Sequence, residues 1–350
     1  MLRLASAHRW LSTTTTTNTS KSPLLDTFGR FHDYLRISLT ERCNLRCTYC
    51  MPKDGVQLSP PDDLLTSQEL MKMVNVFAKL GVRKIRLTGG EPTLRKDLIE
   101  LCGAISSTPG IEILALTTNG LLLSRLGRQL KQSGVSRINI SLDTLHKERF
   151  EAITQRSGLD LVTKGLFEVL ELGFDAVKLN CVVRRNCNEH ELVNFVEMTK
   201  RHRLQVRFLE YMPFDQNQWT HQSLVSYKEM LEMIQSRYPD LAPVDGDSNE
   251  VAKMWQVPGH LGQVGFITAM SNQFCGTCNR LRLTNDGKIK SCLFGQEELS
   301  IRDAVRLGNE DDIVATIAQA VRNKKHSLGG HASPTAISQS PNRPMILIGG

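Results

Sequence analysis

Apolar and polar residues alternate along several short segments of the chain, and longer amphipathic segments separate them. Six short segments are expected to form strands: residues 35–39, 84–88, 113–117, 137–142, 177–183 and 205–210. Five segments between them carry apolar residues at helical spacing: residues 67–80, 96–107, 121–133, 159–172 and 189–203. Repeated strand–helix alternation predicts parallel strands joined by right-handed crossovers. The pattern therefore predicts an α/β fold of six β/α units.

Most of the expected strands have one apolar and one polar face. Arg36 and Ser38 alternate with apolar residues in the first strand, and Arg86 does so in the second. Ser141 and Lys178 occupy equivalent positions in the fourth and fifth strands. Successive side chains of a strand point to opposite faces, and parallel strands covered on both faces are normally apolar throughout. The pattern predicts helices on the apolar face and a ligand-filled space on the polar face, as in an incomplete TIM-like (β/α)6 barrel.

The composition changes after the sixth expected strand. Residues 238–250 are rich in Pro, Asp, Gly, Ser and Asn, which predicts a linker. We expect residues 26–245 to form the partial barrel and residues 246–350 to form a β-containing extension that closes its mouth. The elements expected in this extension are strands over 265–268, 281–284 and 288–291, a hairpin turn at 285–287, a helix over 301–322, and a polar loop-like tail from 324 until 345–348.

Residues 1–25 have the composition of a targeting segment. They contain Arg3, Arg9 and Lys21, no acidic residue, and a hydroxyl-rich tract that includes Thr13 to Thr17. A secretory signal would need a clean apolar core, whereas basic, Ser/Thr-rich and acid-poor leaders are typical of organelle transit peptides. We predict a disordered mitochondrial transit peptide over residues 1–25 and a location in the mitochondrial matrix; an ordinary disordered terminus is the alternative.

The overall composition excludes several classes of protein. Of the 350 residues, 40% are apolar and 23% are charged, which excludes a disordered chain, a fibre and a small disulfide scaffold. No run of about 18 apolar residues is present, so no membrane span is predicted. The net charge of +7 suits an anionic small molecule. No nucleic-acid partner is predicted, since the chain has no long basic stripe with interleaved aromatic residues.

Six of the nine cysteines fall into two tight groups, which indicates metal binding rather than disulfides. Cys43, Cys47 and Cys50 have the spacing C-x3-C-x2-C and follow the first expected strand, where barrel enzymes place their chemistry. Three thiolates can hold a four-iron cluster and leave one iron open to a ligand. A zinc knuckle is the alternative, although structural zinc normally has four ligands and no fourth is evident nearby.

Cys275, Cys278 and Cys292 form the second group, again with no fourth cysteine nearby. Their spacing alone leaves two alternatives open, which are zinc with a distant histidine and a second four-iron cluster with an open iron. Arg280 and Arg282 share one face of the adjacent expected strand. Two guanidinium groups at this spacing can clamp a phosphate chain; a solvated strand face is the alternative.

These motifs together resemble a known family. The first cysteine group, followed by Gly89-Gly90-Glu91-Pro92 after the second expected strand, resembles the radical S-adenosylmethionine superfamily. Both groups, the run 275–282 and the terminal Gly349-Gly350 resemble the molybdenum cofactor biosynthesis protein A family, the GTP 3′,8-cyclases. The resemblance extends from about residue 35 to the end and departs between residues 329 and 343. It implies an incomplete six-unit barrel whose C-terminal region carries a second cluster.

The resemblance also implies roles for individual residues. The cluster that binds S-adenosylmethionine would be held by Cys43, Cys47 and Cys50, and a substrate-side cluster by Cys275, Cys278 and Cys292. The positions that contact S-adenosylmethionine are Tyr49, Gly90, Ser141 and Met212. The positions that contact GTP are Arg36, Arg86, Thr117, Lys178, Arg280 and Arg282. The tail with Gly349 and Gly350 is implied to enter the active site and to support the reaction.

The implied cofactors are two [4Fe–4S] clusters and S-adenosylmethionine, and the implied substrate is GTP. Cleavage of S-adenosylmethionine gives a 5′-deoxyadenosyl radical that removes the C3′ hydrogen of GTP. The C3′ radical then attacks C8, and reduction gives 3′,8-cyclo-7,8-dihydro-GTP, the first step of molybdenum cofactor biosynthesis. A downstream cyclic pyranopterin monophosphate synthase would use this product. The electron donor is not indicated, and a homodimer is left open.

Two other functions are alternatives on the sequence. One is a radical enzyme with an auxiliary cluster that acts on a peptide, and the other is a zinc-dependent binding module. The run Cys-Asn-Arg-Leu-Arg at residues 278–282 and the terminal Gly-Gly favour the cyclase. Both cysteine groups are then expected to face one shared cavity.

Overall fold

A single mixed sheet of twelve strands organises the computed structural model, which describes residues 22–51, 55–215, 217–245 and 251–349. The strands are β1 Tyr34–Ser38, β2 Lys84–Thr88, β3 Ile113–Thr118, β4 Arg137–Ser141, β5 Ala176–Val183, β6 Leu204–Glu210, β7 Ala242–Pro243, β8 Lys253–Gln256, β9 Gln263–Ile267, β10 Arg280–Leu283, β11 Lys288–Lys290 and β12 Leu299–Ser300. Their order is β12-β11-β10-β1-β2-β3-β4-β5-β6-β9-β8-β7. From β10 to β9 all neighbours are parallel, and the antiparallel pairs lie at the two edges. The expected α/β fold is confirmed.

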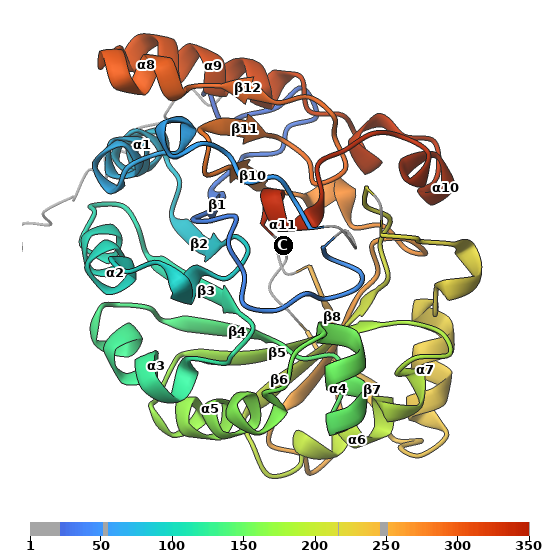
Figure 1. Ribbon diagram of the computed structural model, residues 1–350. Helices are drawn as coiled ribbons and strands as arrows, with labels where there is room; N and C mark the ends of the chain where they lie inside the picture. The colour runs from blue at the N-terminus through green and yellow to red at the C-terminus, as the bar shows by residue number, and fades with distance from the viewer. Residues whose placement is uncertain (1–21, 52–54, 216, 246–250, 350) are drawn as a thin grey trace, which may run out of the picture.

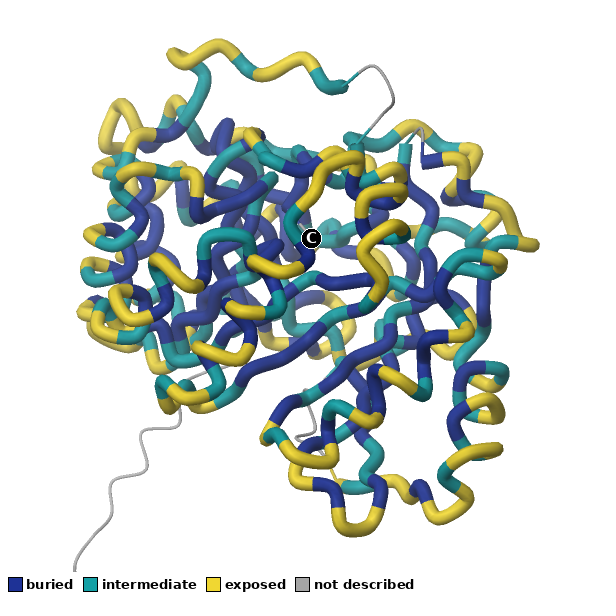
Figure 2. Tube along the Cα trace, turned by 60° about the horizontal axis from the view of Figure 1, so that its bottom comes forward, coloured by how far each residue is buried: buried dark blue, intermediate teal, exposed yellow. Residues whose placement is uncertain are grey.

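The described residues form eleven α-helices, and most of them cover one face of the sheet. The helices are α1 Ser67–Leu80, α2 Leu98–Ser106, α3 Leu123–Gln132, α4 Lys147–Thr154, α5 Leu159–Glu171, α6 Leu192–Met198, α7 Tyr227–Gln235, α8 Arg302–Leu307, α9 Glu310–Arg322, α10 Pro334–Ser338 and α11 Met345–Ile348. Figure 1 shows the strands curving around the centre of the molecule, with α1, α2, α3 and α5 outside them and α11 inside. Apolar side chains from strands and helices form one large core, and Figure 2 shows buried strands within a shell of exposed helical turns.

Local sequence signals set the ends of α1, which was predicted with these bounds. Thr66 Oγ1 accepts a hydrogen bond from Glu69 N at 3.2 Å, and the Glu69 carboxylate accepts one from Thr66 N at 2.8 Å. Gly81 ends the helix in a left-handed conformation. Met73 and Phe77, one turn apart, are fully buried in the core.

The C-terminal part of the chain extends the parallel sheet at both ends, which the sequence analysis missed. β10 pairs with β1 and β9 pairs with β6, so eight strands run parallel instead of the six that were expected. The edge of a six-stranded sheet would expose unpaired backbone N–H and C=O groups. The two added strands satisfy these groups on β1 and β6 and connect the C-terminal residues to both sides of the sheet.

Other expectations need smaller corrections. The helix expected over 301–322 is two helices, α8 and α9, because the chain turns at Gly308 with φ of 73°. The expected linker 238–250 contains β7, which pairs with β8, and its residues 246–250 lie outside the described part of the chain. The sequence analysis also missed α4 and α7.

The predicted leader lies mostly outside the described residues, since the description begins at residue 22. Residues 22–25 belong to the fold, and the Leu24 side chain is fully buried in the core. Among the described helices, none is long and apolar enough to cross a membrane.

The packing of α3 against α5 depends on a residue without a side chain. A Cβ on Gly165 of α5 would lie 2.8 Å from Leu123 Cβ and 3.2 Å from Ser124 N. We expect Gly165→Ala to lower the free energy of unfolding by about 1–3 kcal/mol because the two helices must move apart. Gly103 in α2 is the control, because a Cβ there meets nothing within 4 Å. Gly103→Ala should raise this free energy by about 0.5–1 kcal/mol. Urea denaturation measures both, and equal stability of the two variants would contradict the packing argument.

Candidate active site

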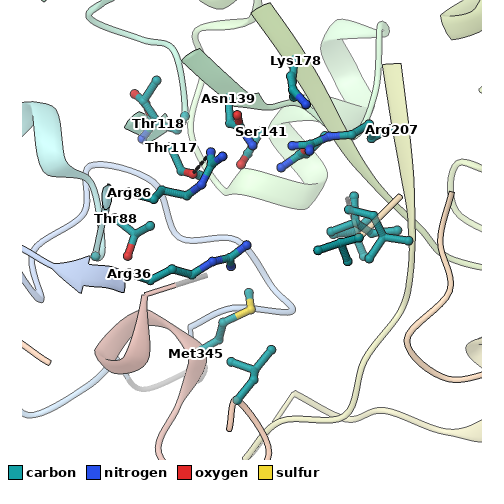
Figure 3. A pocket seen from close by; sticks show the side chains of 18 of the residues that line it. Arg36, Arg86, Thr88, Thr117, Thr118, Asn139, Ser141, Lys178, Arg207 and Met345 are labelled. Carbon is teal, nitrogen blue, oxygen red and sulfur yellow. Dashed lines mark hydrogen bonds between the residues drawn. The ribbon is translucent and has the colours of Figure 1, made fainter. Parts of the chain in front are cut away.

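One cavity of about 550 Å³ lies on the polar face of the sheet. Its walls include residues of β1 to β6, the loops that follow these strands, and β10. The predicted site residues that line it are Arg36, Cys43, Cys47, Tyr49, Cys50, Arg86, Gly90, Thr117, Ser141, Lys178, Met212, Arg280 and Arg282. Figure 3 shows Arg36, Arg86 and Lys178 directed toward this space from three different strands. The structure therefore brings most of the predicted site together.

Three arginines form a row across the sheet. Arg282 of β10 lies opposite Arg36 of β1, which lies opposite Arg86 of β2. Side chains at one register of parallel strands point to the same face, and neighbouring strands are only about 4.8 Å apart. The sheet pairing therefore holds three guanidinium groups beside one another in the cavity.

The arginine row has too few partners for its charge. Arg36 Nε is buried and, within the described residues, has no hydrogen-bond partner. Burial, together with the charges of Arg36 and Arg280, lowers the pKa of Arg282 to about 9. Arg86 is better satisfied, since it donates to the Tyr34 hydroxyl and to Thr117 Oγ1, the latter at 3.3 Å. Buried cations without matching anions are unfavourable, so the row indicates a negatively charged ligand.

The sequence analysis missed three further members of this wall. Tyr34 lies two residues before Arg36 and is flanked by Lys84 and Arg280 in the neighbouring strands. Arg207 of β6 donates to Asn180 Oδ1 at 2.9 and 2.7 Å. All of them line the cavity. The strand period of two gave a signal for Tyr34 and Lys84, because each lies two positions before an arginine already assigned to the polar face.

The first cysteine group lies on the loop that follows β1. Arg46 N donates to Thr154 O at 2.8 Å and Thr48 N donates to Ile153 O at 2.9 Å, which docks this loop onto the end of α4. Cys43 Sγ accepts from Leu45 N at 3.4 Å and lies 4.0 Å from Asn119 Nδ2. Burial and the negative charges of Cys43 and Asp143 raise the pKa of the Cys50 thiol to about 12. The three thiols therefore border the cavity in a buried setting, and among the described residues no cationic side chain donates a hydrogen bond to their sulfur atoms.

Gly89 and Gly90 pack against the base of this cysteine loop. A Cβ on Gly90 would lie 2.4 Å from Arg42 O, and one on Gly89 would lie 2.5 Å from Thr40 O. Gly90 N donates to Thr40 O at 2.7 Å and Glu91 N donates to Arg42 O at 2.8 Å. The glycines thus allow the backbone after β2 to lie directly against the backbone that carries the thiols.

Two buried carboxyl groups lie at the same end of the cavity. Glu91 accepts from Thr118 Oγ1 and Asn119 N at 2.7 Å each, and Asp143 accepts from Val182 N at 2.9 Å. Burial raises the pKa of both. These hydrogen bonds fix the loop after β2 to the end of β3 and the loop after β4 to β5, beside the cysteines.

The second cysteine group lies beside the cavity. Cys275, Cys278 and Cys292 are not among its described lining residues, whereas Phe274, Arg280 and Leu293 next to them in the chain are. The expectation that both groups face the cavity is thus met only by the first. The Arg280 guanidinium lies 4.9 Å from the Phe274 ring centroid and donates to Cys278 Sγ at 3.3 Å. This side chain separates Cys278 from the cavity.

The electrostatic setting of the second group differs from that of the first. Burial alone would raise the pKa of Cys278, but the positive charges of Arg280 and Lys324 lower it to about 6. Burial, together with the negative charges of Cys292 and Cys278, raises the pKa of Cys275. Among the described residues, no three His, Cys, Asp or Glu side chains converge to hold a single metal ion.

The C-terminal tail reaches the arginine row. Gly349 O accepts a hydrogen bond from Arg282 Nη1 at 2.6 Å, and Met345 of α11 lines the cavity. Arg343 fixes the tail from behind, with its Nη2 2.7 Å from Asp286 Oδ2 and its Nε 2.9 Å from Glu298 Oε2. The structure therefore docks the tail whose sequence departs from the expected pattern. Gly350 lies outside the described residues.

Comparison with known proteins identifies the family. Residues 37–199 match the family model of the radical SAM superfamily, and residues 204–329 match the model named Molybdenum Cofactor Synthesis C. The chain is 48% identical, over 93% of its length, to "GTP 3′,8-cyclase, mitochondrial" of Arabidopsis thaliana, of which it covers 83%. It is 39% identical over 93% to "GTP 3′,8-cyclase" of Limosilactobacillus fermentum, of which it covers 99%. The chain belongs to the GTP 3′,8-cyclase family. The resemblance inferred from the motifs is confirmed.

Some other relatives of this GTP 3′,8-cyclase family member are longer. "Molybdenum cofactor biosynthesis protein 1" of Bos taurus is 51% identical over 93% of this chain, which covers only 51% of that protein. The chain thus spans about half the length of these animal relatives. Among solved structures, SuiB of Streptococcus suis bound to S-adenosylmethionine has a TM-score of 0.58 and 15% identity, covering 84% of this chain and 68% of SuiB. This likeness shows a shared fold.

The row of arginines is expected to lower the stability of the ligand-free protein and to favour the binding of an anion. We expect Arg36→Met to raise the free energy of unfolding of the ligand-free protein by about 1 kcal/mol, because a buried cation is removed. Inorganic tripolyphosphate should stabilise the parent protein by about 2.7 kcal/mol at one hundred times its Kd, and should stabilise the variant much less. Thermal and urea unfolding with and without tripolyphosphate measure both effects.

Arg83→Met is the matched control for this test. Arg83 pairs with Glu112 at 3.3 Å on the surface, where 63% and 58% of the two side chains are exposed. Exposed pairs of this kind contribute little, so neither stability nor the response to tripolyphosphate should change. A ligand-free Arg36→Met protein that is less stable than the Arg83→Met protein would contradict the argument from uncompensated charge.

Proposed function

We propose that the protein is a GTP 3′,8-cyclase that uses S-adenosylmethionine and a [4Fe–4S] cluster to convert GTP to 3′,8-cyclo-7,8-dihydro-GTP. The observation that carries the proposal is one cavity with three thiols at one end and a row of guanidinium groups in its wall. A thiol-bound cluster and a triphosphate would then lie at separate parts of one cavity. The match to the cyclase relatives supports this assignment.

The residues of the first group fit an iron–sulfur cluster. Cys43, Cys47 and Cys50 lie on one loop and all border the cavity. In a four-iron cube each thiolate binds a different iron, so the thiols need not converge on one point as zinc ligands must. Burial makes it unfavourable for these thiols to lose their protons. Binding of the thiolates to iron would offset that cost.

S-adenosylmethionine would bind between this loop and the centre of the sheet. Tyr49, Gly90, Ser141 and Met212 line the cavity around the thiols and are the residues proposed to contact it. When bound, the cluster and S-adenosylmethionine would supply the radical that abstracts a hydrogen atom from C3′ of GTP. The role of the chain is to hold this carbon in reach and to keep water out.

GTP would bind with its phosphates on the cationic wall. The residues proposed to contact it are Arg36, Arg86, Thr117, Lys178, Arg280 and Arg282. Guanidinium groups at one sheet register can bind several phosphate oxygens at once, and each such charge-assisted bond is strong. Binding would also remove the mutual repulsion that lowers the pKa of Arg282. Tyr34 orients Arg86 through its hydroxyl.

Cys275, Cys278 and Cys292 are proposed to hold a second [4Fe–4S] cluster that contacts the purine. This proposal requires Arg280 to swing away from Cys278 when GTP binds, since its guanidinium now separates that thiol from the cavity. A triphosphate provides the stronger partner for this charge.

The C-terminal tail contributes Gly349. Its carbonyl accepts a hydrogen bond from Arg282 and so orients a group that is proposed to bind phosphate.

The remaining assignments follow from this function. We propose that the open sheet is an incomplete six-unit β/α barrel over residues 26–245, closed by residues 246–350. A mitochondrial matrix location is proposed from the composition of residues 1–25, and the Arabidopsis relative is named mitochondrial. The product would pass to a cyclic pyranopterin monophosphate synthase. The electron donor is unidentified, and a homodimer is an assembly to be tested.

The decisive experiment is anaerobic incubation of the reconstituted protein with GTP, S-adenosylmethionine and dithionite. We expect 5′-deoxyadenosine and a cyclised isomer of GTP, which chromatography separates from GTP before mass analysis. About eight irons per chain, with matching sulfide, would support two clusters. Zinc without sulfide, or 5′-deoxyadenosine with no GTP-derived product, would refute the proposal, and the second result would point to a peptide substrate instead.

Gly349 provides a test of the tail. Its φ is 76°, and a Cβ there would lie 2.2 Å from Thr88 Oγ1 and 3.2 Å from Gly89 N. We expect Gly349→Ala to reduce cyclisation at least about tenfold, because a misplacement of about 1 Å in an active site commonly costs more than that. Gly308→Ala is the control, since Gly308 has a similar φ of 73° and open space around it. Equal activity of the two variants would show that the tail position is not needed.

A further inference from the structure

Lys324 is buried directly behind the second cysteine group. It follows α9, and only 4% of its surface is exposed. Its ammonium group donates to Cys278 Sγ at 3.3 Å, to Cys278 O at 3.3 Å and to Arg280 O at 3.0 Å. Within the described residues it forms no ion pair with a carboxylate. The nearest group that can carry the compensating charge is therefore the Cys278 thiolate.

His32 holds this lysine in place. The Lys324 ammonium has only donors, so His32 Nε2, at 2.8 Å, must accept. His32 Nδ1 then carries the proton and donates to Leu24 O at 3.0 Å. The imidazole is fully buried and neutral in this arrangement. A chain of hydrogen bonds thus connects the backbone of Leu24 with the sulfur of Cys278.

The same N-terminal segment, residues 24–33, also supports Cys275. Arg30 Nη1 donates to Cys275 O at 2.8 Å and to His326 O at 2.9 Å, while Arg30 Nε is paired with Asp26 at 2.6 Å. The segment therefore fixes the cysteine loop through backbone carbonyls and through Lys324. If the Lys324 side chain only filled space, its ammonium group would not need to donate to the Cys278 sulfur and to two backbone carbonyls of that loop.

Among the described residues, no cationic side chain donates a hydrogen bond to a sulfur of the first cysteine group. Its described hydrogen bonds to sulfur come from the backbone of Leu45 and the amide of Asn119, which are neutral. Cationic donors to a thiolate ligand favour the reduced, more negative state of an iron–sulfur cluster and so raise its reduction potential. The two clusters would consequently differ in potential because of the protein around them.

We propose that Lys324, oriented by His32, is a positioning residue that holds Cys278 as a cluster ligand and raises the reduction potential of the second cluster. This inference rests on the second cluster of the proposed function. It assigns to the N-terminal segment 24–33 a role in cluster retention that is independent of GTP and S-adenosylmethionine binding.

The test is a redox titration of Lys324→Met, followed by electron paramagnetic resonance, in which the first cluster serves as an internal reference. We expect the potential of the second cluster to become more negative while that of the first is unchanged. We also expect an iron chelator to remove the iron of the second cluster about tenfold faster than in the parent protein. Lys324→Arg, which keeps the charge, should restore part of both properties.

Two further variants separate a specific effect from a general one. Lys325→Met is the matched control, because the Lys325 side chain is exposed, and it should change neither potential nor iron release. His32→Phe keeps the charge of Lys324 but removes its acceptor, so iron release should accelerate with a smaller change in potential. His32→Phe also decides the question if Lys324→Met does not fold.

The outcomes are distinct. A parent protein with only about four irons would overturn the second cluster and the inference with it. A parent protein with about eight irons, together with unchanged potential and iron release in Lys324→Met and His32→Phe, would overturn the inference alone. Equal shifts of both clusters would also overturn it, because they would show a general disturbance of the fold.

Discussion

Positive charge on the inner face of the sheet is the constraint on which the rest of the structure depends. Parallel pairing of β10, β1 and β2 sets Arg282, Arg36 and Arg86 at one register, where no helix can cover them without burying bare cations. Helices therefore pack on the opposite, apolar face. The sheet curves around a cavity with a cationic wall, so the buried charges that destabilise the ligand-free protein are the same charges that favour an anionic ligand.

The two cysteine groups use the same residue type in opposite electrostatic settings. Around Cys43, Cys47 and Cys50, burial and neighbouring negative groups disfavour the thiolate, and the sulfur hydrogen bonds are neutral. Around Cys278, the cations Arg280 and Lys324 favour it. The two proposed clusters would therefore differ in reduction potential, with the lower potential at the first group. The protein achieves this difference without changing the ligand atoms.

Both ends of the described chain complete the site from outside the repeated β/α units. The N-terminal segment 24–33 supports the second cysteine group through Arg30 and His32, more than two hundred residues away in sequence. The C-terminal tail passes Arg343, which is anchored by Asp286 and Glu298, and delivers Gly349 to Arg282. The sequence pattern of these two terminal segments predicts only loops, so it does not reveal these contacts.

The sequence by itself determined the α/β class, the six β/α strands, both cysteine groups and the charged face, because each depends on short-range periodicity or spacing. Three-dimensional pairing alone decided that β9 and β10 flank the parallel strands, that Arg207 joins the cavity wall, and that Cys278 lies behind Arg280. Lys324 and His32 belong to this second set. Their proposed role depends on contacts between residues far apart in the chain, and no local pattern of apolar and polar residues predicts such contacts.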